Sequence, residues 1–468
     1  MSAARAGQIE GLRGAPLDAL VLGGGINGAG VLRDLALRAK DAQRPLRAGL
    51  VEQGHFGSGT SGKNSQLIHG GLRYLKYLQF PLVREGLRER SILLGIAPQF
   101  VHPLEFLLPM YGLKPRVLYG AGLWLYDLFA GSQRIARHRI VSDREVVLME
   151  PGLSRPGLSA AAVFWDGAVQ SARFVVENIL DAVENGALAA NYVKAETWKR
   201  AADGDWRVQC QDTLAGLRFE IRARKLVDAR GAWMHGSSLR LVRGSHLVLP
   251  RVTAGDRAIA HFEPDGRIVF LIPWGSRNQL TLVGTTDQDH RGTPEQVHIS
   301  AAEREYLMAV LRKLFPDCAD VAPISAFSSL RTLVGSGGGS ATRASRGHKI
   351  WNSSDGILHI AGGKYTTYRL MSEEAGDQVC AEVAPELVAV HRTAHTPFAR
   401  VERAIGEAME QRLADYLFVS TYLGYERRWD AASLRPLAEA LGAKLGWDEG
   451  RVGQEVDDII EAADPVGA

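Results

Sequence analysis

The sequence contains little cysteine, and its cysteines are not arranged for a metal or a disulfide framework. Cys210, Cys318 and Cys380 are the only three in 468 residues, and they form neither a CxxC pair nor a Cys/His cluster. An odd number of widely separated thiols indicates a reducing compartment and argues against a structural zinc site. The histidines and acidic residues also lack metal-ligand spacing, so we expect no metal site.

Neither a long apolar run nor a strong excess of one charge occurs in the chain. No stretch of about 18 uncharged apolar residues is found, and residues 1–16 lack the apolar core of a secretory signal. We therefore expect a cytoplasmic protein that does not span a membrane. The formal net charge is +3, with Lys and Arg scattered along the chain, which argues against a dedicated nucleic-acid binder and leaves small anionic ligands open.

One apolar segment raises the question of a membrane surface. Val117–Ala130 (VLYGAGLWLYDLFA) is followed by the basic residues Arg134, Arg137 and Arg139. An apolar aromatic helix with a basic flank can lie at a bilayer interface, for example on the inner face of the cytoplasmic membrane. The alternative is a buried helix followed by a solvated basic turn, and the pattern alone favours this alternative.

The length indicates more than one packed unit. A single core stops growing near roughly 250–300 residues, and this chain has 468. Because 46% of the residues are apolar and 23% are charged, the composition is that of an ordinary folded protein. We therefore expect a multi-domain α/β protein.

A glycine-rich turn joins the first predicted strand to a helix. Gly23, Gly25 and Gly28 form G-x-G-x-x-G after LDALVL, and Glu52 ends the next predicted strand, LRAGLVEQ. Missing side chains let the backbone amides and the helix N-terminus approach a pyrophosphate, while the acid accepts ribose hydroxyls. Residues 17–54 therefore predict a βαβ unit that binds a dinucleotide.

Two later strand-turns decide between FAD and NAD. LVDARGAW at 226–233 and ILHIAGGK at 357–364 both end in glycine turns, far from the first one in sequence. A flavin bound along its length needs such distant backbone segments in one cavity, whereas a simple NAD domain does not.

The sequence between these two strand-turns and the sequence after them also show clear patterns. Residues 245–287 read as four short strands, which predict an antiparallel sheet, and the chain from about residue 397 reads as helices.

Several motifs together resemble the FAD-dependent glycerol-3-phosphate dehydrogenases. In order and spacing they are GGGINGAG, TSGKNSQLIHGGLRYL, LVREGLRER, APQFVHPLEFLLP, RGSHLVLPR, FLIPW, VGTTD and GGKYTTYR. The resemblance covers about residues 17–380. It implies a glutathione-reductase-type FAD-binding Rossmann domain (about 17–75, 145–245 and 340–380), an inserted antiparallel-sheet substrate domain (about 76–144 and 246–339) and a short helical C-terminal cap (397–468).

The resemblance also implies a reaction and a set of site residues. The reaction is oxidation of glycerol 3-phosphate, with electrons passed to a quinone; a homodimer is left open. The residues implied to face the substrate are Arg73, Tyr74, Arg331, Arg343 and Lys364, with His69 and His246 near the reacting carbon. The residues implied to contact FAD are Gly23, Gly25, Gly28, Glu52, Thr60, Ser61, Leu67, His69, Gly70, Val193, Gly231, Gly362, Gly363, Lys364 and Thr366.

The chemistry of the reaction needs these residue types. Guanidinium groups hold a phosphate dianion through paired hydrogen bonds, and Lys adds a point charge. Removal of the hydroxyl proton suits a neutral histidine, whose ordinary pKa is about 6.5. We assign His246 as the base and His69 to positioning, with Arg331 beside them. Without the resemblance, a single Arg or His is more often a paired structural residue.

The sequence departs from the family pattern at several places. GKNSQ at 62–66 replaces a serine-rich stretch, Thr332 replaces a proline after Arg331, and DARGAW at 228–233 replaces N-A-T-G-P-W. The C-terminal cap, with about seventy residues after 397, is expected to lack part of the family's cap. Two alternatives therefore remain open: an FAD-dependent enzyme for another small phosphorylated alcohol or hydroxy acid, and a flavin-binding protein without activity.

Overall fold

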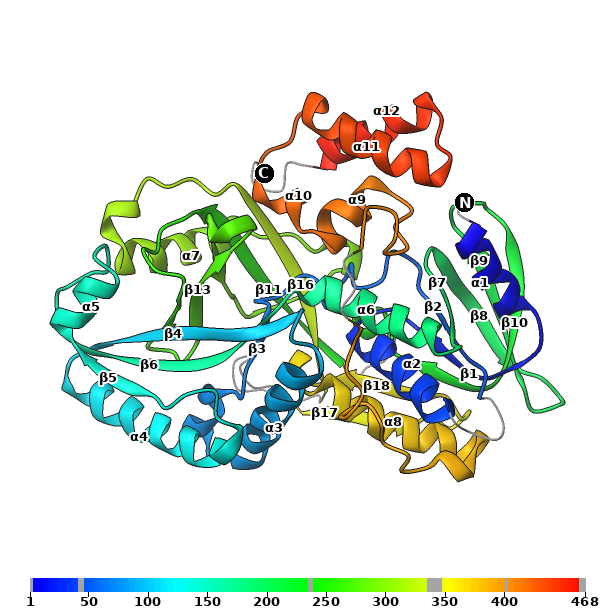
Figure 1. Ribbon diagram of the computed structural model, residues 1–468, viewed down its shortest axis with the longest axis horizontal. Helices are drawn as coiled ribbons and strands as arrows, with labels where there is room; N and C mark the ends of the chain where they lie inside the picture. The colour runs from blue at the N-terminus through cyan, green and yellow to red at the C-terminus, as the bar shows by residue number, and fades with distance from the viewer. Residues whose placement is uncertain (1–2, 41–45, 235–238, 335–346, 400–402, 463–468) are drawn as a thin grey trace.

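The computed structural model describes residues 3–40, 46–234, 239–334, 347–399 and 403–462. Two sheets lie side by side in this part of the chain, and a group of C-terminal helices stands above them (Figure 1). We call the sheet on the right of Figure 1 sheet A and the sheet on the left sheet B.

Sheet A has eight strands and carries the glycine turns. Its main path runs β17-β18-β10-β1-β2-β7, and β9 and β8 continue from β10 as an antiparallel ribbon. The strands β18, β10, β1, β2 and β7 pair in parallel, whereas β17 is antiparallel to β18. The bounds are β1 Leu17–Leu22, β2 Ala48–Val51, β7 Leu188–Ala190, β8 Val193–Arg200, β9 Trp206–Asp212, β10 Arg218–Asp228, β17 His348–Asn352 and β18 Leu358–Gly362.

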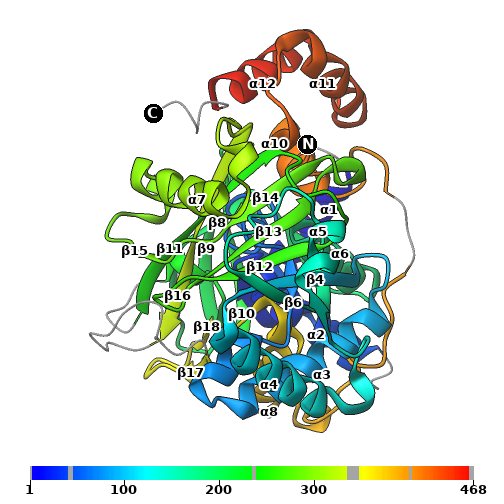
Figure 2. The ribbon, with the colours of Figure 1, turned by 90° about the vertical axis from the view of Figure 1, so that its left-hand side faces the viewer.

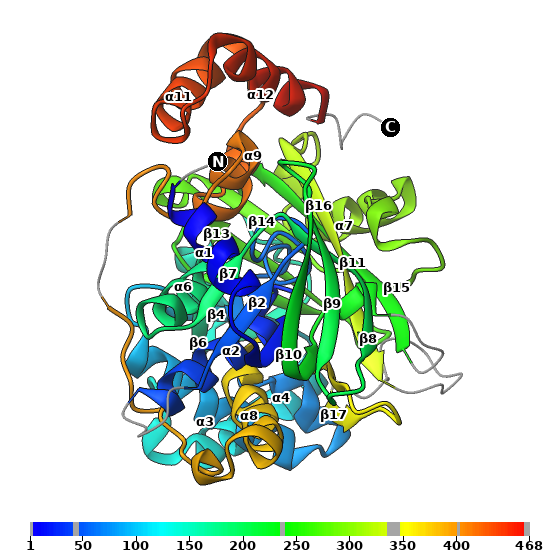
Figure 3. The same ribbon diagram turned by 90° about the vertical axis from the view of Figure 1, so that its right-hand side faces the viewer.

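Both faces of sheet A are covered. Helices α2 (Ile26–Ala39), α6 (Ser171–Glu184) and α8 (Tyr368–Val383) pack on one face, and α1 (Ala3–Arg13) packs beside β7 and β10 (Figure 3). Every residue of β1 and β2 is buried, as expected for parallel strands between two layers. Arg5 of α1 anchors this helix because its buried guanidinium donates to both carboxylate oxygens of Asp212, at 2.9 and 3.0 Å.

Sheet B has ten strands, and its main path runs β15-β11-β14-β13-β12-β4-β6-β3 (Figure 2). The four strands predicted within 245–287 form β11–β14 and pair antiparallel, while β4 and β12 pair in parallel. The bounds are β3 Leu67–Ile68, β4 Val101–Tyr111, β5 Arg139–Ser142, β6 Leu158–Val169, β11 Leu239–Pro250, β12 Ala258–Phe262, β13 Ile268–Trp274, β14 Leu280–Gly284, β15 Gln288–Asp289 and β16 Ser325–Val334.

Four helices accompany sheet B. They are α3 (Phe80–Ile96), α4 (Leu113–Ala130), α5 (Asp143–Met149) and α7 (Ala301–Leu314). Helices α3 and α4 pack against each other and against the β4–β6 pair, and α7 packs on β11 and β14. By pairing, β6 and the first residues of β11 are parts of sheet B, although they fall within the segment 145–245 that we assigned to the FAD-binding unit. The boundaries between the units stay a prediction.

Helix α4 exposes an apolar stripe. Leu113, Val117, Trp124 and Leu128 follow one another at four-, seven- and four-residue spacing, so they share one side of the helix, and they are 57–75% exposed. The opposite side buries Leu123, Tyr126 and Ala130. The alternative of a buried helix therefore holds for one side only, because the other side does not meet the core. In the described part of the chain, no helix is both long and apolar enough to cross a membrane.

The C-terminal segment is helical, as predicted. It contains α9 (Leu413–Asp415), the π-helical turn η9 (Tyr416–Ser420), α10 (Leu423–Glu426), α11 (Ala431–Leu445) and α12 (Glu449–Ala462). Leu417, Leu434, Val452 and Val456 form part of a separate small core between these helices. The segment docks on the rest of the protein through Tyr422, whose hydroxyl accepts from the amide of Ala172 and donates to the carbonyl of Gly62.

Candidate active site

The carboxyl ends of three parallel strands meet at one edge of sheet A. Leu22 of β1 lies opposite Asp228 of β10, and Asp228 lies opposite His359 of β18. The turns that leave these strands contain Gly23, Gly231 and Gly362, with φ of 102°, 58° and 73°. Three segments far apart in the sequence thus reach a common edge, which is the place where open parallel sheets bind dinucleotides.

The first glycine turn has no room for side chains. A Cβ on Gly28 would lie 1.9 Å from the carbonyl oxygen of Gly23, and a Cβ on Gly23 would lie 2.8 Å from that of Ala229. Gly25 caps helix α2, and the hydroxyl of Ser61 accepts from the amide of Ile26 at 2.9 Å. A helix N-terminus reached through such a turn is an anion site suited to a pyrophosphate.

Glu52 lies at the end of β2 and supports the same turn. Its carboxylate accepts from the amides of Gly24 and Gly54 at 2.7 and 2.8 Å, and its carbonyl accepts from the amide of Val193. Burial raises the pKa of Glu52, although these amide hydrogen bonds oppose the rise. Because a carboxylate has about four acceptor positions, Glu52 retains acceptor capacity for ribose hydroxyls.

The loop from Thr60 to Gly71 connects sheet A to sheet B. Thr60 donates to the carbonyl of Leu330 at 2.6 Å. Residues 62–66 differ from the family's serine-rich stretch. Within them, the Asn64 side chain donates to the carbonyl of Ser61 and accepts from the amide of Gln66. The replacement residues are therefore integrated into the loop. Burial lowers the pKa of Lys63 in the same stretch.

A cavity of about 80 Å³ lies where this loop faces sheet B. His69, Tyr74, Asp166, Thr285 and Asp287 give it polar groups. The rest of the lining is apolar and consists of Leu67, Gly71, Leu72, Phe106, Phe164, Ala260, Phe262, Ile268 and Phe270. The cavity thus combines a polar part with an aromatic part.

Two of the predicted cations lie against the polar part. The Lys364 ammonium lies 3.8 Å from the centre of the Tyr74 ring. Arg331 of β16 forms an ion pair with Asp287 and donates to the Thr285 hydroxyl at 2.9 Å. The side chain of Arg73, whose backbone belongs to the 3₁₀ turn η1 (Leu72–Tyr77), and the whole of Arg343 lie outside the described residues.

His69 and His246 occupy different environments. His69 lines the cavity, and its backbone is held by Thr366, whose hydroxyl accepts from the His69 amide at 3.1 Å and donates to the His69 carbonyl at 3.3 Å. His246 is buried, stacks on Phe327 and lies 2.9 Å from the Ser65 hydroxyl through Nε2. Its Nδ1 has no hydrogen-bond partner among the described residues.

The surroundings of His246 change its proton affinity. Burial, and then the positive charge of Arg331, lower the pKa of His246 to about 3. The ordinary imidazole pKa of about 6.5 therefore does not apply to His246 in this environment. The imidazole is neutral near pH 7, and one ring nitrogen remains free to receive a proton.

The remaining predicted flavin contacts follow the strand ends. Gly362 and Gly363 both have positive φ, and a Cβ on Gly363 would lie 2.3 Å from the Met371 sulfur. Gly70 and Leu67 belong to the loop described above, and Val193 begins β8 beside Glu52. The buried and unpartnered Nδ1 of His246, the closed glycine turn and Glu52 together fit a dinucleotide with a polar ring system, such as FAD.

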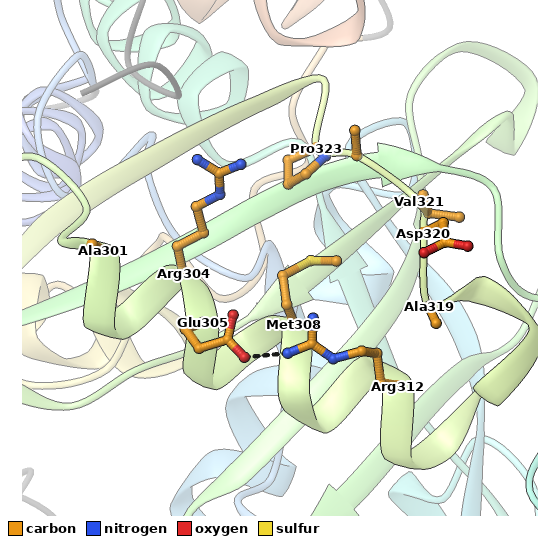
Figure 4. A pocket seen from close by; sticks show the side chains of 10 residues that line it. Ala301, Arg304, Glu305, Met308, Arg312, Ala319, Asp320, Val321 and Pro323 are labelled. Atoms are coloured by element: carbon orange, nitrogen blue, oxygen red, sulfur yellow. Dashed lines mark hydrogen bonds and ion pairs between the residues drawn. The ribbon is translucent and has the colours of Figure 1, made fainter.

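A second cavity, of about 300 Å³, lies between α7 and the segment 319–323 and holds none of the predicted site residues (Figure 4). Its lining includes Arg312, which forms an ion pair with Glu305. Charge in this cavity is thus partly balanced within the protein.

Sequence reasoning missed two acidic residues of the first cavity. Asp287 is the last residue of the VGTTD motif, but it was not assigned a role, because its ion pair with Arg331 depends on the pairing of β11 with β16 and β14. Asp166 lies inside a strand of mostly apolar residues, where nothing local distinguishes it. In the described part of the chain, no group of acidic, histidine or cysteine side chains has the arrangement of a metal site.

Comparisons with known proteins agree with this architecture. A family model described as DAO, FAD dependent oxidoreductase, matches residues 18–369. The aerobic glycerol-3-phosphate dehydrogenase of Staphylococcus haemolyticus is 32% identical over 410 residues, covering 83% of this chain and 72% of that protein. The glycerol-3-phosphate dehydrogenase of Synechocystis sp. is 33% identical over 395 residues, covering 77% and 69%.

Solved structures are similar in fold. A glycerol-3-phosphate dehydrogenase from Bacillus halodurans, complexed with FAD, has a TM-score of 0.75 at 22% identity and covers 100% of this chain and 99% of that chain. An L-alpha-glycerophosphate oxidase from Mycoplasma pneumoniae, with FAD bound, has a TM-score of 0.59 at 16% identity, covering 78% and 95%. The predicted fold class is confirmed. The family match and the dehydrogenases of Staphylococcus haemolyticus and Synechocystis sp. together show that the chain is an FAD-dependent oxidoreductase and belongs to the glycerol-3-phosphate dehydrogenase family.

Proposed function

We propose that this enzyme oxidises sn-glycerol 3-phosphate at C2 to dihydroxyacetone phosphate. The observation that carries the proposal is the polar part of the cavity, where His69 of the loop and Tyr74 of η1 meet Asp287 and its partner Arg331 of β16. The names of the relatives add the substrate. When bound, FAD supplies the two-electron acceptor for the hydride that leaves C2.

The phosphate would be held by cations from both sides of the cavity. Arg331 is already oriented by Asp287 and Thr285, so its guanidinium loses little conformational freedom on binding. Lys364 adds a point charge next to Tyr74. We assign Arg73 and Arg343 to the same phosphate on the basis of the family motif.

His246 would accept the hydroxyl proton. The positive charge of Arg331 contributes to its low pKa, and a phosphate dianion that pairs with Arg331 would cancel that contribution and raise the basicity of the imidazole. His69, which is fixed through its backbone by Thr366, would position the substrate oxygen. The C–H bond then breaks as a hydride leaves, while the O–H bond gives its proton to His246.

The flavin spectrum tests the proposal. The purified holoenzyme should lose its yellow colour anaerobically with sn-glycerol 3-phosphate and keep it with glycerol, because glycerol offers nothing for the cations to bind. Equal bleaching by both compounds would contradict the phosphate site. Bleaching by another phosphorylated alcohol or a hydroxy acid, with glycerol 3-phosphate inert, would change the substrate, and a flavin that no such compound reduces would leave a binding protein.

We further propose that a quinone receives the electrons from the reduced enzyme. The aromatic part of the cavity, with Phe106, Phe164 and Phe270, suits a planar apolar molecule rather than a sugar phosphate. Reoxidation of the reduced enzyme by a soluble quinone should be faster than reoxidation by oxygen. Stoichiometric peroxide with no response to quinone would indicate an oxidase.

The exposed stripe of α4 would attach the protein to an anionic bilayer. Its apolar residues are flanked by Lys114, Arg116, Arg137 and Arg139, all of them exposed. Apolar side chains that enter the interface and basic side chains that meet lipid phosphates reinforce each other. A quinone dissolved in the lipid would then be close to α4, which packs over β6 of the cavity wall.

A further inference from the structure

Asp166 of β6 joins three elements around the cavity. It is 3% exposed, and its carboxylate accepts from the amide of Gly70 at 3.2 Å, from Nη1 of Arg90 on α3 at 2.6 Å and from the Tyr126 hydroxyl on α4 at 2.9 Å to each oxygen. The same residue lines the cavity. A single buried carboxylate thus contacts the loop, both helices and the space in which the substrate would bind.

The turn that Asp166 holds has little freedom. A Cβ on Gly70 would lie 2.4 Å from the Tyr126 hydroxyl oxygen, and a Cβ on Gly86 would lie 3.1 Å from the Gly70 carbonyl oxygen. Gly71 has φ of 83°, and its carbonyl accepts from the amide of Tyr74. His69 and Tyr74 therefore stand on either side of a turn whose position depends on Asp166, Tyr126 and α3.

We propose that Asp166 is a positioning residue that fixes the Gly70–Gly71 turn, so that His69 and Tyr74 face the substrate in a constant geometry. The inference rests on the proposed function. Asp166 acts through the turn and through Arg90 and Tyr126, and it does not itself transfer a proton or an electron.

Among the described residues, the groups that hydrogen-bond to Asp166 are all donors, which requires a carboxylate at this position. An ionised carboxylate offers only acceptors, whereas the amide of asparagine would direct N–H groups at one or more of these donors. Burial, with the charge of Asp166, raises the pKa of Tyr126 well above its ordinary value, so the phenol stays protonated and donates. Removing the charge would also leave Arg90 buried without its counter-ion.

Two variants and one control test the proposal. Asp166→Asn and Tyr126→Phe should raise KM for glycerol 3-phosphate, the first by at least roughly tenfold and the second by about threefold, with kcat changed less than KM. Tyr126→Phe keeps both charges and the ring, so it should fold even if Asp166→Asn does not. Glu150→Gln is the control, because Glu150 is also buried and accepts backbone amides, from Ala254 and Gly255, but does not line the cavity.

The outcomes separate this inference from the proposed function. If both variants keep the wild-type KM while the wild type is reduced by glycerol 3-phosphate, the positioning role is wrong and the function stands. An equal rise of KM in Glu150→Gln would also overturn the inference, because it would reflect general loosening of the fold. If glycerol 3-phosphate does not reduce the wild-type flavin, the proposed function itself fails.

Discussion

At the scale of single residues, the positive charge of Arg331 acts on the proton affinity of the buried His246. The imidazole is neutral because burial and the guanidinium both disfavour its protonation. Arg331 in turn is held by Asp287. Substrate binding would therefore change the electrostatics of the base as well as the position of the reacting carbon.

His246→Ala should slow anaerobic flavin reduction by roughly 10²-fold or more, because the hydroxyl proton would lose its acceptor. His391→Ala is the matched control, since His391 is exposed and paired with Asp377. Stopped-flow absorbance of the flavin measures both rates. A normal reduction rate in His246→Ala would transfer the role of base to another group, with His69 the next to be replaced.

The ionised carboxylate of Asp228 should add to the free energy of unfolding at pH values above about 4. Burial alone would raise its pKa, but the hydrogen bonds and charge of Arg230, with His359 Nδ1 3.5 Å away, outweigh burial and lower the pKa to about 2, below the ordinary 3.8. The contribution, roughly 2 kcal/mol, is therefore present at neutral pH and disappears as the pH falls from about 4 to 2. Urea unfolding at several pH values should show a smaller acid loss in Asp228→Asn than in the wild type; equal losses would contradict the assignment.

Residue roles were only partly accessible from the sequence. A motif such as LIHGGLRYL predicts that its residues lie near one another in the site, because residues close together in one loop stay close in the folded protein. The partner of Arg331 was not predictable in this way, because Asp287 lies in the loop between β14 and β15 and becomes a neighbour of Arg331 only when β11, β14 and β16 pair. The low pKa of His246 likewise arises from burial, which no local pattern reports.

At the scale of elements, α4 has two sides with different surroundings. One side contributes Leu123 and Tyr126 to the core, and the other presents the stripe that includes Trp124 and Leu128. The sequence predicted the helix but not its exposed side, because apolar residues on both sides leave the periodicity without a clear direction.

Replacement of Trp124 and Leu128 by serine should abolish flotation with anionic vesicles at low salt and leave glycerol 3-phosphate-dependent flavin reduction intact, because the stripe faces away from the cavity. Leu148→Ser on α5 is the control: Leu148 is 82% exposed and lies outside the stripe. If the wild-type protein does not float, the stripe has another partner. Flotation of the double variant equal to that of the wild type would place the contact elsewhere.

Other elements were predictable to different degrees. The strand before Gly23, the helix after it and the four strands of 245–287 have clear patterns of period two or clear turn signals. Helix α1 was not predicted, since residues 1–16 have only a weak apolar pattern, and its attachment depends on the ion pair of Arg5 with Asp212. Tertiary contacts supply the stability that its local sequence lacks.

At the scale of the whole molecule, the chain passes between the two sheets several times. Sheet A takes strands from residues 17–51, 188–228 and 348–362, and sheet B takes strands from the intervening segments. Through the family motifs the sequence predicts a discontinuous division into two units, which stays a prediction. It did not place β6 with sheet B, because a strand of apolar residues can join either sheet.

The order of strands at the dinucleotide edge also has a consequence for biosynthesis. β18 lies beside β10, and β10 lies beside β1, so the edge needs residues from the beginning, the middle and the late part of the chain. During translation Gly23 leaves the ribosome long before Gly362, and the nascent protein cannot close the edge in between. Capture of the cofactor is then a late event, and chains that stop before residue 358 should accumulate without bound flavin.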